Sequence, residues 1–168
     1  HIQMQGHGKC QYVNVQYPWE GHEEVVPGEI PMKHNLVGSY VKYFTYPDHM
    51  EGKPVYISFQ GVESAFALWL NGVFIGYSED SFTPSEFDVS AAMLPGENKL
   101  AVQVFQYSSG SWLEDQDFWR FSGIFRDVYL YTVPAVHIED MFVKTLFEED
   151  TFARSTLELQ LKIKAAKN

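Results

Sequence analysis

The sequence is short of cysteine, of basic side chains and of long apolar runs, and each shortage excludes a class of protein. Cys10 is the single cysteine, so no internal disulfide can form. Twelve lysines and arginines stand against 22 acidic residues, and a net charge of −10 repels nucleic acid and anionic membrane surfaces. No apolar run approaches the roughly 20 residues of a membrane helix, and the opening "HIQMQGHGKC" lacks the hydrophobic stretch of a signal peptide. We therefore expect no nucleic-acid partner, no membrane and a cytoplasmic location.

Metal-binding histidine spacings are also missing. The six histidines show neither an HxH nor an HExxH pattern, so we expect no zinc site. What the sequence has in plenty is aromatic residues, which make up 16% of the chain. Aromatic side chains favour β structure, and they are common in carbohydrate sites, where flat sugar faces lie against rings.

The pattern along the chain predicts an all-β protein. Residues 1–38 hold Pro18, Pro27 and Pro31 and are expected to form an irregular strap across a sheet. Alternating strands follow in "SYVKYFTY", "KPVYISFQGV", "NKLAVQVFQY" and "GIFRDVYLYTV". Asn71-Gly72 lies between two apolar runs and predicts a β-hairpin, because a type I′ turn needs positive φ at both central residues. "SEFDVSAAML" is expected to form at most a short helix.

Strands at such short intervals, without long helical periodicity, indicate a β-sandwich of the jelly-roll type. We place this domain at residues 1–134. Beyond Pro134, "HIEDMFVKTLF" and "STLELQLKIKAAKN" alternate again. Two strands alone are marginally stable, so residues 135–168 are expected to be the incomplete start of a second β domain.

The stretch "SWLEDQDFWR", residues 111–120, crowds the carboxylates Glu114, Asp115 and Asp117 among aromatic side chains. Crowded carboxylates repel one another, and apolar neighbours remove part of their water. Such a cluster needs an ion, an arginine or a polar ligand to offset that cost.

Three segments together resemble a known family: "YVNVQYPWEGH", "ALWLNGVFIGYSEDSFTPSEFDVS" and "GENKLAVQVFQYSSGSWLEDQDFWRFSGIFRDVYL". They are similar to the N-terminal sugar-binding domain of the β-galactosidases of glycoside hydrolase family 2. The resemblance implies a jelly-roll, galactose-binding-like β-sandwich, followed by the first strands of an immunoglobulin-like domain. It also implies that the sequence is a piece of a longer chain.

The resemblance further implies site residues. Asn71 would hydrogen-bond galactose hydroxyls, and Asp117 would contact both the sugar and a sodium ion. Carboxylate oxygens suit hard cations and accept hydrogen bonds from vicinal hydroxyls. The parent enzyme would bind magnesium at sites outside this chain and would be a homo-oligomer.

Structural alternatives remain open beside these roles. Asn71 could be a turn former only, and Asp117 a solvated loop residue. Glu114 or Asp115 could pair with Arg120 or Arg126. Trp112 and Trp119 could be sugar platforms, although core or interdomain packing is the favoured role for Trp119. The "FRD" of residues 125–127 is expected to be a strand whose charges support the fold.

Retaining glycoside hydrolysis needs two carboxyls about 5 to 5.5 Å apart. Asp115 and Asp117 lie on one element, whereas an acid and a nucleophile must approach the anomeric carbon from different directions. In the resembled family both catalytic glutamates lie in a (β/α)₈ barrel, and no barrel sequence is present. We therefore expect an inactive sugar-binding domain of a β-galactosidase, with a β-galactoside substrate and the barrel as partners. The alternatives are a stand-alone carbohydrate-binding module and a domain of a β-glucuronidase or β-mannosidase.

Overall fold

A computed structural model gives the fold and describes residues 1–114, 117–148 and 151–165. The chain divides into two compact units, residues 1–131 and 132–168. Each unit is described by itself below. Among the described helices, none has the length and apolar composition needed to cross a membrane.

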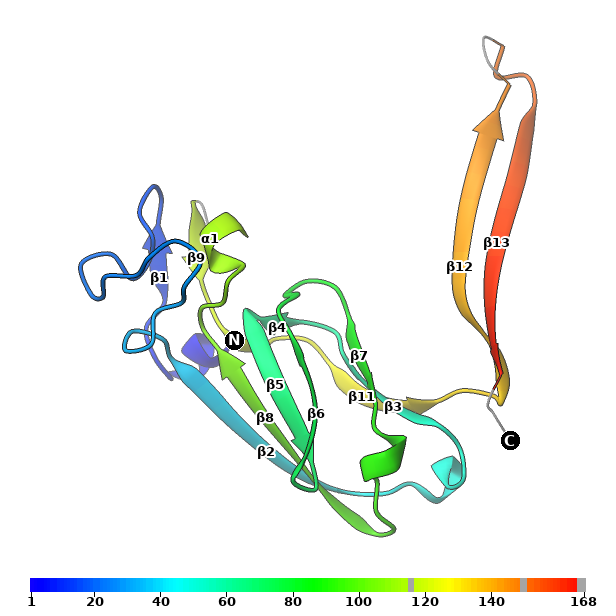
Figure 1. The fold of residues 1–168 in the computed structure, drawn as a ribbon, viewed down its shortest axis with the longest axis horizontal. Helices are drawn as coiled ribbons and strands as arrows, with labels where there is room; N and C mark the ends of the chain where they lie inside the picture. The colour runs from blue at the N-terminus through cyan, green and yellow to red at the C-terminus, as the bar shows by residue number, and fades with distance from the viewer. Residues whose placement is uncertain (115–116, 149–150, 166–168) are drawn as a thin grey trace. The chain divides into compact units, whose positions relative to one another are not determined.

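Strands dominate both units, and every helix is a single short turn (Figure 1). The strands are β1 (Gln11–Val13), β2 (Val37–Thr45), β3 (Val55–Phe59), β4 (Val62–Glu63), β5 (Ala65–Leu70), β6 (Val73–Ser78), β7 (Ser85–Asp88), β8 (Glu97–Phe105), β9 (Phe118–Arg120), β10 (Gly123–Ile124), β11 (Val128–Thr132), β12 (Val136–Phe147) and β13 (Ser155–Ala165). The helical turns are η1 (Ile2–Gln5), η2 (Asp48–Met50), η3 (Ser90–Ala92) and α1 (Ser111–Glu114).

The first unit is a β-sandwich, as the sequence predicts. One sheet has the strand order β2-β8-β5-β6 and the other has the order β11-β3-β7. The pairs β2-β8, β8-β5 and β5-β6 of the first sheet and the pair β3-β7 of the second are antiparallel. Two short ladders, β1-β9 and β10-β4, join the connecting segments at one end of the sandwich.

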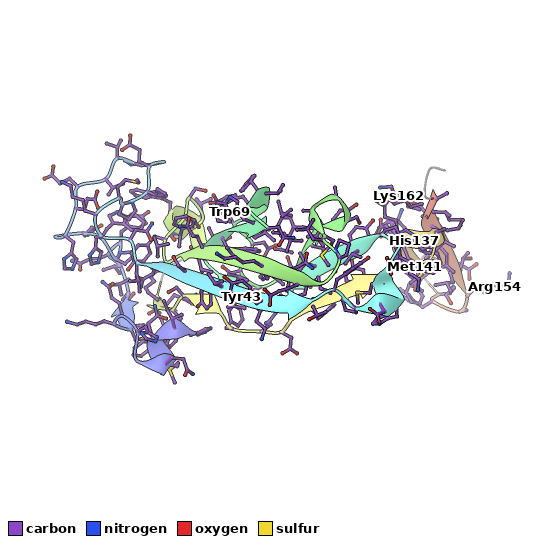
Figure 2. All side chains as sticks on the ribbon, turned by 90° about the horizontal axis from the view of Figure 1, so that it is seen from below. Tyr43, Trp69, His137, Met141, Arg154 and Lys162 are labelled. Carbon is purple, nitrogen blue, oxygen red and sulfur yellow. The ribbon has the colours of Figure 1, made fainter. Side chains whose placement is uncertain are left out.

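The core lies between the two sheets. Alternate residues of β3, β5 and β8 point inward and are almost fully buried: Val55, Ile57 and Phe59; Phe66, Leu68 and Leu70; Leu100, Val102 and Val104. This period of two is what strand geometry requires of a half-buried sheet. Figure 2 shows Tyr43 on β2 and Trp69 on β5, which occupy the opposite phase of their strands.

The hairpin prediction at Asn71-Gly72 is confirmed. β5 and β6 pair across this turn, and φ is 54° at Asn71 and 84° at Gly72. Both angles lie in the left-handed region that a type I′ turn requires.

The short-helix prediction for "SEFDVSAAML" is wrong for its first half. Ser85–Asp88 form β7 and pair with β3, and only η3 is helical. Ser85 points inward and is buried, as is Val89 just after the strand, so burial against the core prevails over the weak helical pattern. The Asp88 carboxylate accepts a hydrogen bond from the Ser90 amide at 2.9 Å, which starts the turn. Likewise, the "FRD" segment connects β10 to β11 instead of forming a strand.

Residues 1–36 gather at one end of the sandwich, beside β9 and α1, instead of crossing a sheet face (Figure 1). The Ile2 amide donates to the Ser122 carbonyl at 2.9 Å, and the Gln3 side chain donates to the Ser122 hydroxyl at 2.7 Å. Further along, Trp19 is 2% exposed and packs against Tyr107 and Trp112. This irregular segment therefore has a small aromatic core of its own.

The second unit is one long hairpin, β12-β13, within its described residues. Cross-strand partners on one face are apolar: Ile138 and Ile163, Met141 and Leu161, Val143 and Leu159. The other face holds Lys144 beside Glu158, and Glu139 with Lys162 at 2.8 Å and Lys164 at 3.1 Å. Met141 and Lys162 stand among the side chains of this hairpin in Figure 2. That the hairpin begins an immunoglobulin-like domain stays a prediction.

Candidate functional site

A short ladder brings the beginning of the chain beside the carboxylate cluster. β1 and β9 pair antiparallel, with Tyr12 opposite Trp119 and Val13 opposite Phe118. The Asp117 amide extends the ladder by donating to the Asn14 carbonyl at 3.1 Å. A segment near residue 12 therefore fixes the backbone at Asp117, the last carboxylate of the predicted cluster.

Asp117 stands at the turn that enters β9, with φ at 54°. Aspartate tolerates this left-handed conformation better than most residues do, and such positions cluster at functional sites. Its side chain is exposed, and its carboxylate accepts a hydrogen bond from the Tyr12 hydroxyl. This bond to the ionised carboxylate raises the pKa of Tyr12. An ionised carboxylate has about four acceptor positions, so Asp117 keeps capacity for further donors or a cation.

Aromatic rings gather on both sides of the chain segment that enters β9. The rings of Tyr12 and Trp119 lie 5.3 Å apart, and both side chains are about half exposed. Trp112 is half-buried, and its ring centroid lies 4.4 Å from that of Tyr17. Its indole nitrogen donates a hydrogen bond to the Glu29 carbonyl at 2.5 Å. A hollow of about 290 Å³ opens beside them, lined by Asn14, Val15, Gln16, Tyr17, Ser111, Trp112 and Leu113.

Two ionisable side chains are buried at the same end of the sandwich. Arg120 on β9 is 3% exposed and Glu63 on β4 is 7% exposed, and both line one enclosed hollow of about 50 Å³. Burial raises the pKa of the Glu63 carboxyl to about 7, against an opposing effect of Arg120. Burial also lowers the pKa of Arg120 to about 10. His1 approaches the Glu63 carboxylate to 3.6 Å.

The structure places the other residues predicted for this site in different surroundings. Glu114 ends α1, is exposed and lines the hollow that Arg120 lines. Asp115 lies outside the described residues. Arg126 donates to the backbone carbonyls of Gln60 and Phe82. Burial of Trp119 in the sandwich core is wrong, because its side chain is 54% exposed at the edge of the β1-β9 ladder.

Asn71 lies at the opposite end of β5 from Glu63 and Arg120. Leu70 pairs with Leu100, whereas Ala65 pairs with Phe105 near the cluster, and a six-residue strand is about 20 Å long. The side-chain nitrogen of Asn71, Nδ2, donates to the Ala92 carbonyl at 2.8 Å and to the Asn98 side-chain oxygen at 2.7 Å. Its side-chain oxygen accepts from the Lys99 amide at 2.9 Å. The structure thus gives Asn71 a turn-forming role and does not bring it beside Asp117, and its sugar contact stays a prediction.

Metal ligands are sparse in this part of the chain. Across residues 1–114, 117–148 and 151–165, no three His, Cys, Asp or Glu side chains gather closely enough to hold an ion. A cation bound at Asp117 would therefore need its other ligands from outside the described residues, and the sodium contact stays a prediction.

Tyr12 and Asn14 are parts of this edge that the sequence did not single out. Both lie in "YVNVQYPWEGH", yet their partner Asp117 is more than 100 residues away along the chain. The sequence alone carries no signal for that pairing, since β1 is only three residues long.

Comparisons with known proteins agree with this architecture. The β-galactosidase of Halalkalibacterium halodurans is 60% identical over 164 residues, and that of Clostridium acetobutylicum is 58% identical over 163 residues. These matches cover 98% and 97% of this chain but only 16% and 18% of the relatives. The chain thus spans less than a fifth of the length of these proteins.

Solved structures share the fold at lower identity. A β-glycosidase from Bacteroides vulgatus matches with a TM-score of 0.64 and 23% identity, over 93% of this chain and 19% of that one. A β-glucuronidase from Bacteroides uniformis matches with a TM-score of 0.67 and 24% identity, over 76% and 16% of the two chains. At these identities the likeness shows the fold alone.

The family model described as "Glycosyl hydrolases family 2, sugar binding domain" matches residues 1–134, which include both sheets, the β1-β9 ladder and Asp117. This match covers most of the chain, which therefore belongs to the sugar-binding domain family of the family 2 glycosyl hydrolases.

Proposed function

We propose that this chain is the non-catalytic sugar-binding domain of a β-galactosidase that hydrolyses terminal β-D-galactose residues of lactose-like substrates. The identity of 60% and 58% to two β-galactosidases supports galactose over the sugars of other family 2 enzymes. The single structural observation that carries the proposal is the exposed Asp117 carboxylate, fixed by the β1-β9 ladder and framed by aromatic rings.

At this edge Asp117 would accept hydrogen bonds from galactosyl hydroxyls and give one oxygen ligand to a sodium ion. Vicinal hydroxyls are donors, and a carboxylate with open acceptor positions suits both tasks. Tyr12 orients the carboxylate through its hydroxyl, and the adjacent Asn14 lines the hollow beside it. Trp112 and Trp119 offer apolar ring surface for the sugar faces.

Catalysis itself requires groups from outside this chain. Retaining hydrolysis uses an acid/base and a nucleophile on opposite sides of the scissile bond. We propose that a (β/α)₈ barrel of the parent protein supplies both, together with the other sodium ligands and the magnesium sites. A homo-oligomeric parent and a cytoplasmic location belong to the same proposal.

A stand-alone carbohydrate-binding module is the second candidate, because the exposed Tyr12 and Trp119 rings resemble a sugar platform. The two candidates differ in how the isolated chain binds galactose. A site wall that offers two or three hydrogen bonds gains little over water, since each net bond contributes about 0.5 to 1.5 kcal/mol.

Calorimetry and turnover of residues 1–168 therefore test the proposal. We expect no hydrolysis of a nitrophenyl galactoside and a galactose dissociation constant weaker than about 1 mM, or about −4 kcal/mol. The parent enzyme, assayed in parallel, should hydrolyse the same substrate. A micromolar constant for the isolated chain would establish the module instead, and an inactive parent would overturn the galactosidase assignment.

A further inference from the structure

The two long edges of the sandwich differ sharply. On one edge β6 and β7 close the space between the sheets. The Ser78 and Ser85 hydroxyls are 2.8 Å apart, and the Phe87 ring packs directly onto Gly76. A Cβ atom added at Gly76 would lie 2.5 Å from that ring, so only glycine allows this approach. The core is sealed on this side.

On the other edge the sheets stay apart. β2 and β11 are the outermost strands here, and in the described part of the chain each pairs with one neighbour, β8 and β3 respectively. A groove of about 700 Å³ opens between them. Its floor consists of core side chains such as Phe59, Leu100 and Val102. The hydrophobic core therefore reaches the surface along this edge.

The lining is almost wholly apolar. Phe44 and Leu130 form part of its walls, and Lys42 is the one charged side chain among the lining residues. Tyr129 and Val41 on the rim are 46% and 56% exposed. A surface of this kind is unfavourable in water, and a patch this large on a soluble domain marks an interaction site.

The free edges define what shape the occupant must have. An edge strand presents a row of unpaired amide and carbonyl groups, which an added strand can satisfy. Such a strand places every second side chain inward, where this groove would receive them. An extended apolar segment fits both features, whereas a small polar ligand would meet few partners on these walls.

The length of the related β-galactosidases suggests where that segment comes from. The chain spans 16% and 18% of the two relatives described above, so most of a protein of their size lies outside residues 1–168. We propose that an extended apolar segment of the same polypeptide, from outside residues 1–168, fills this groove and pairs with the free edge of β2 or β11. This inference rests on the proposal that the chain is part of a longer enzyme.

A photocrosslink in the active parent protein tests the inference. Lys42→p-benzoylphenylalanine places the probe at the groove, and Lys99→p-benzoylphenylalanine, from the opposite face of the same sheet, is the matched control. Galactosidase activity of each labelled parent is measured first. This step separates failure of the proposed function from failure of the groove inference.

We expect the Lys42 probe to capture a peptide from outside residues 1–168 of the same subunit, and the Lys99 probe not to capture it. Mixing ¹⁵N-labelled with unlabelled subunits tells capture within one subunit from capture between two. Amide exchange in β2 or β11 should also be at least tenfold slower in the parent than in the isolated chain. Capture of a second subunit, capture of residues 1–168, the same peptide from both probes, or unchanged exchange at both edges would overturn the inference.

Discussion

Asn71 and Asp117 stand in the same backbone conformation, with φ at 54° in both, yet their side chains have opposite surroundings. Asn71 directs its amide into its own domain, where the amide bonds to Ala92, Asn98 and Lys99. Asp117 stays exposed, and its carboxylate accepts a hydrogen bond from the Tyr12 hydroxyl. The hydrogen bonds of Asn71 thus give it a folding role, whereas the exposed carboxylate of Asp117 keeps acceptor positions for the binding role proposed above.

Removing both side chains without changing φ should separate these roles. Asn71→Gly keeps the turn conformation but leaves Asn98, which is 1% exposed, without one of its donors. The Leu94 amide still donates to Asn98, so the cost is the loss of the three side-chain hydrogen bonds of Asn71. Each such bond contributes about 0.5 to 1.5 kcal/mol, so we expect a loss of about 2 to 4 kcal/mol in the free energy of unfolding. Urea unfolding of residues 1–168, followed by tryptophan fluorescence, measures it, since all four tryptophans lie in the first unit.

Asp117→Gly is the matched control, because the same backbone conformation loses a side chain that is exposed. Its effect on the free energy of unfolding should stay below about 1 kcal/mol. Equal losses for the two variants would remove the distinction between the turns.

The second difference between the two ends of β5 is the presence of the buried Glu63 and Arg120 at one end. The Glu63 carboxyl has a pKa of about 7 in the folded chain, above its ordinary value of 4.5, because it is buried. Between these values the folded state holds a proton that the unfolded state has lost, so stability falls as pH rises from about 4.5 to about 7. A shift of this size corresponds to a loss of up to about 3 kcal/mol.

Glu63→Gln should abolish that slope, since glutamine does not titrate. Urea unfolding at pH 5 and pH 8 measures the change for both proteins. A native chain whose stability rises over this range, or a variant that keeps the full slope, would contradict a buried and protonated Glu63.

The sequence was sufficient for the features that depend on local patterns. Alternating strands, the Asn-Gly hairpin and the sandwich follow from periodicity and turn chemistry. The family resemblance directed attention to Asp117. The strand character of Ser85–Asp88 depends on pairing with β3 and on burial against the core, which no local pattern records, so the local pattern predicts a short helix there instead.

The rest of the site depends on contacts between distant segments. Tyr12 meets Asp117 through a three-residue ladder whose strands are separated by about a hundred residues. The family resemblance predicts a sugar contact for Asn71, whereas its hydrogen bonds to Ala92 and Asn98 depend on how η3 and β8 pack against the turn. Such contacts follow from the assembled sandwich and not from any one stretch of sequence.

The most direct test of the central claim is the kinetics of the parent enzyme carrying Asp117→Ala, with Asn71→Gly measured beside it. If Asp117 contacts the sugar and sodium, Asp117→Ala should lower kcat/KM at least 100-fold, which is about 3 kcal/mol of transition-state stabilisation, and remove most of the response to sodium. The melting temperature of Asp117→Ala should change little. Asn71→Gly should show the reverse pattern, with a clearly lower melting temperature and a smaller loss of kcat/KM than Asp117→Ala. A kcat/KM for Asp117→Ala within a few-fold of the parent value, with the sodium response intact, would show that this edge is scaffolding and contradict the account.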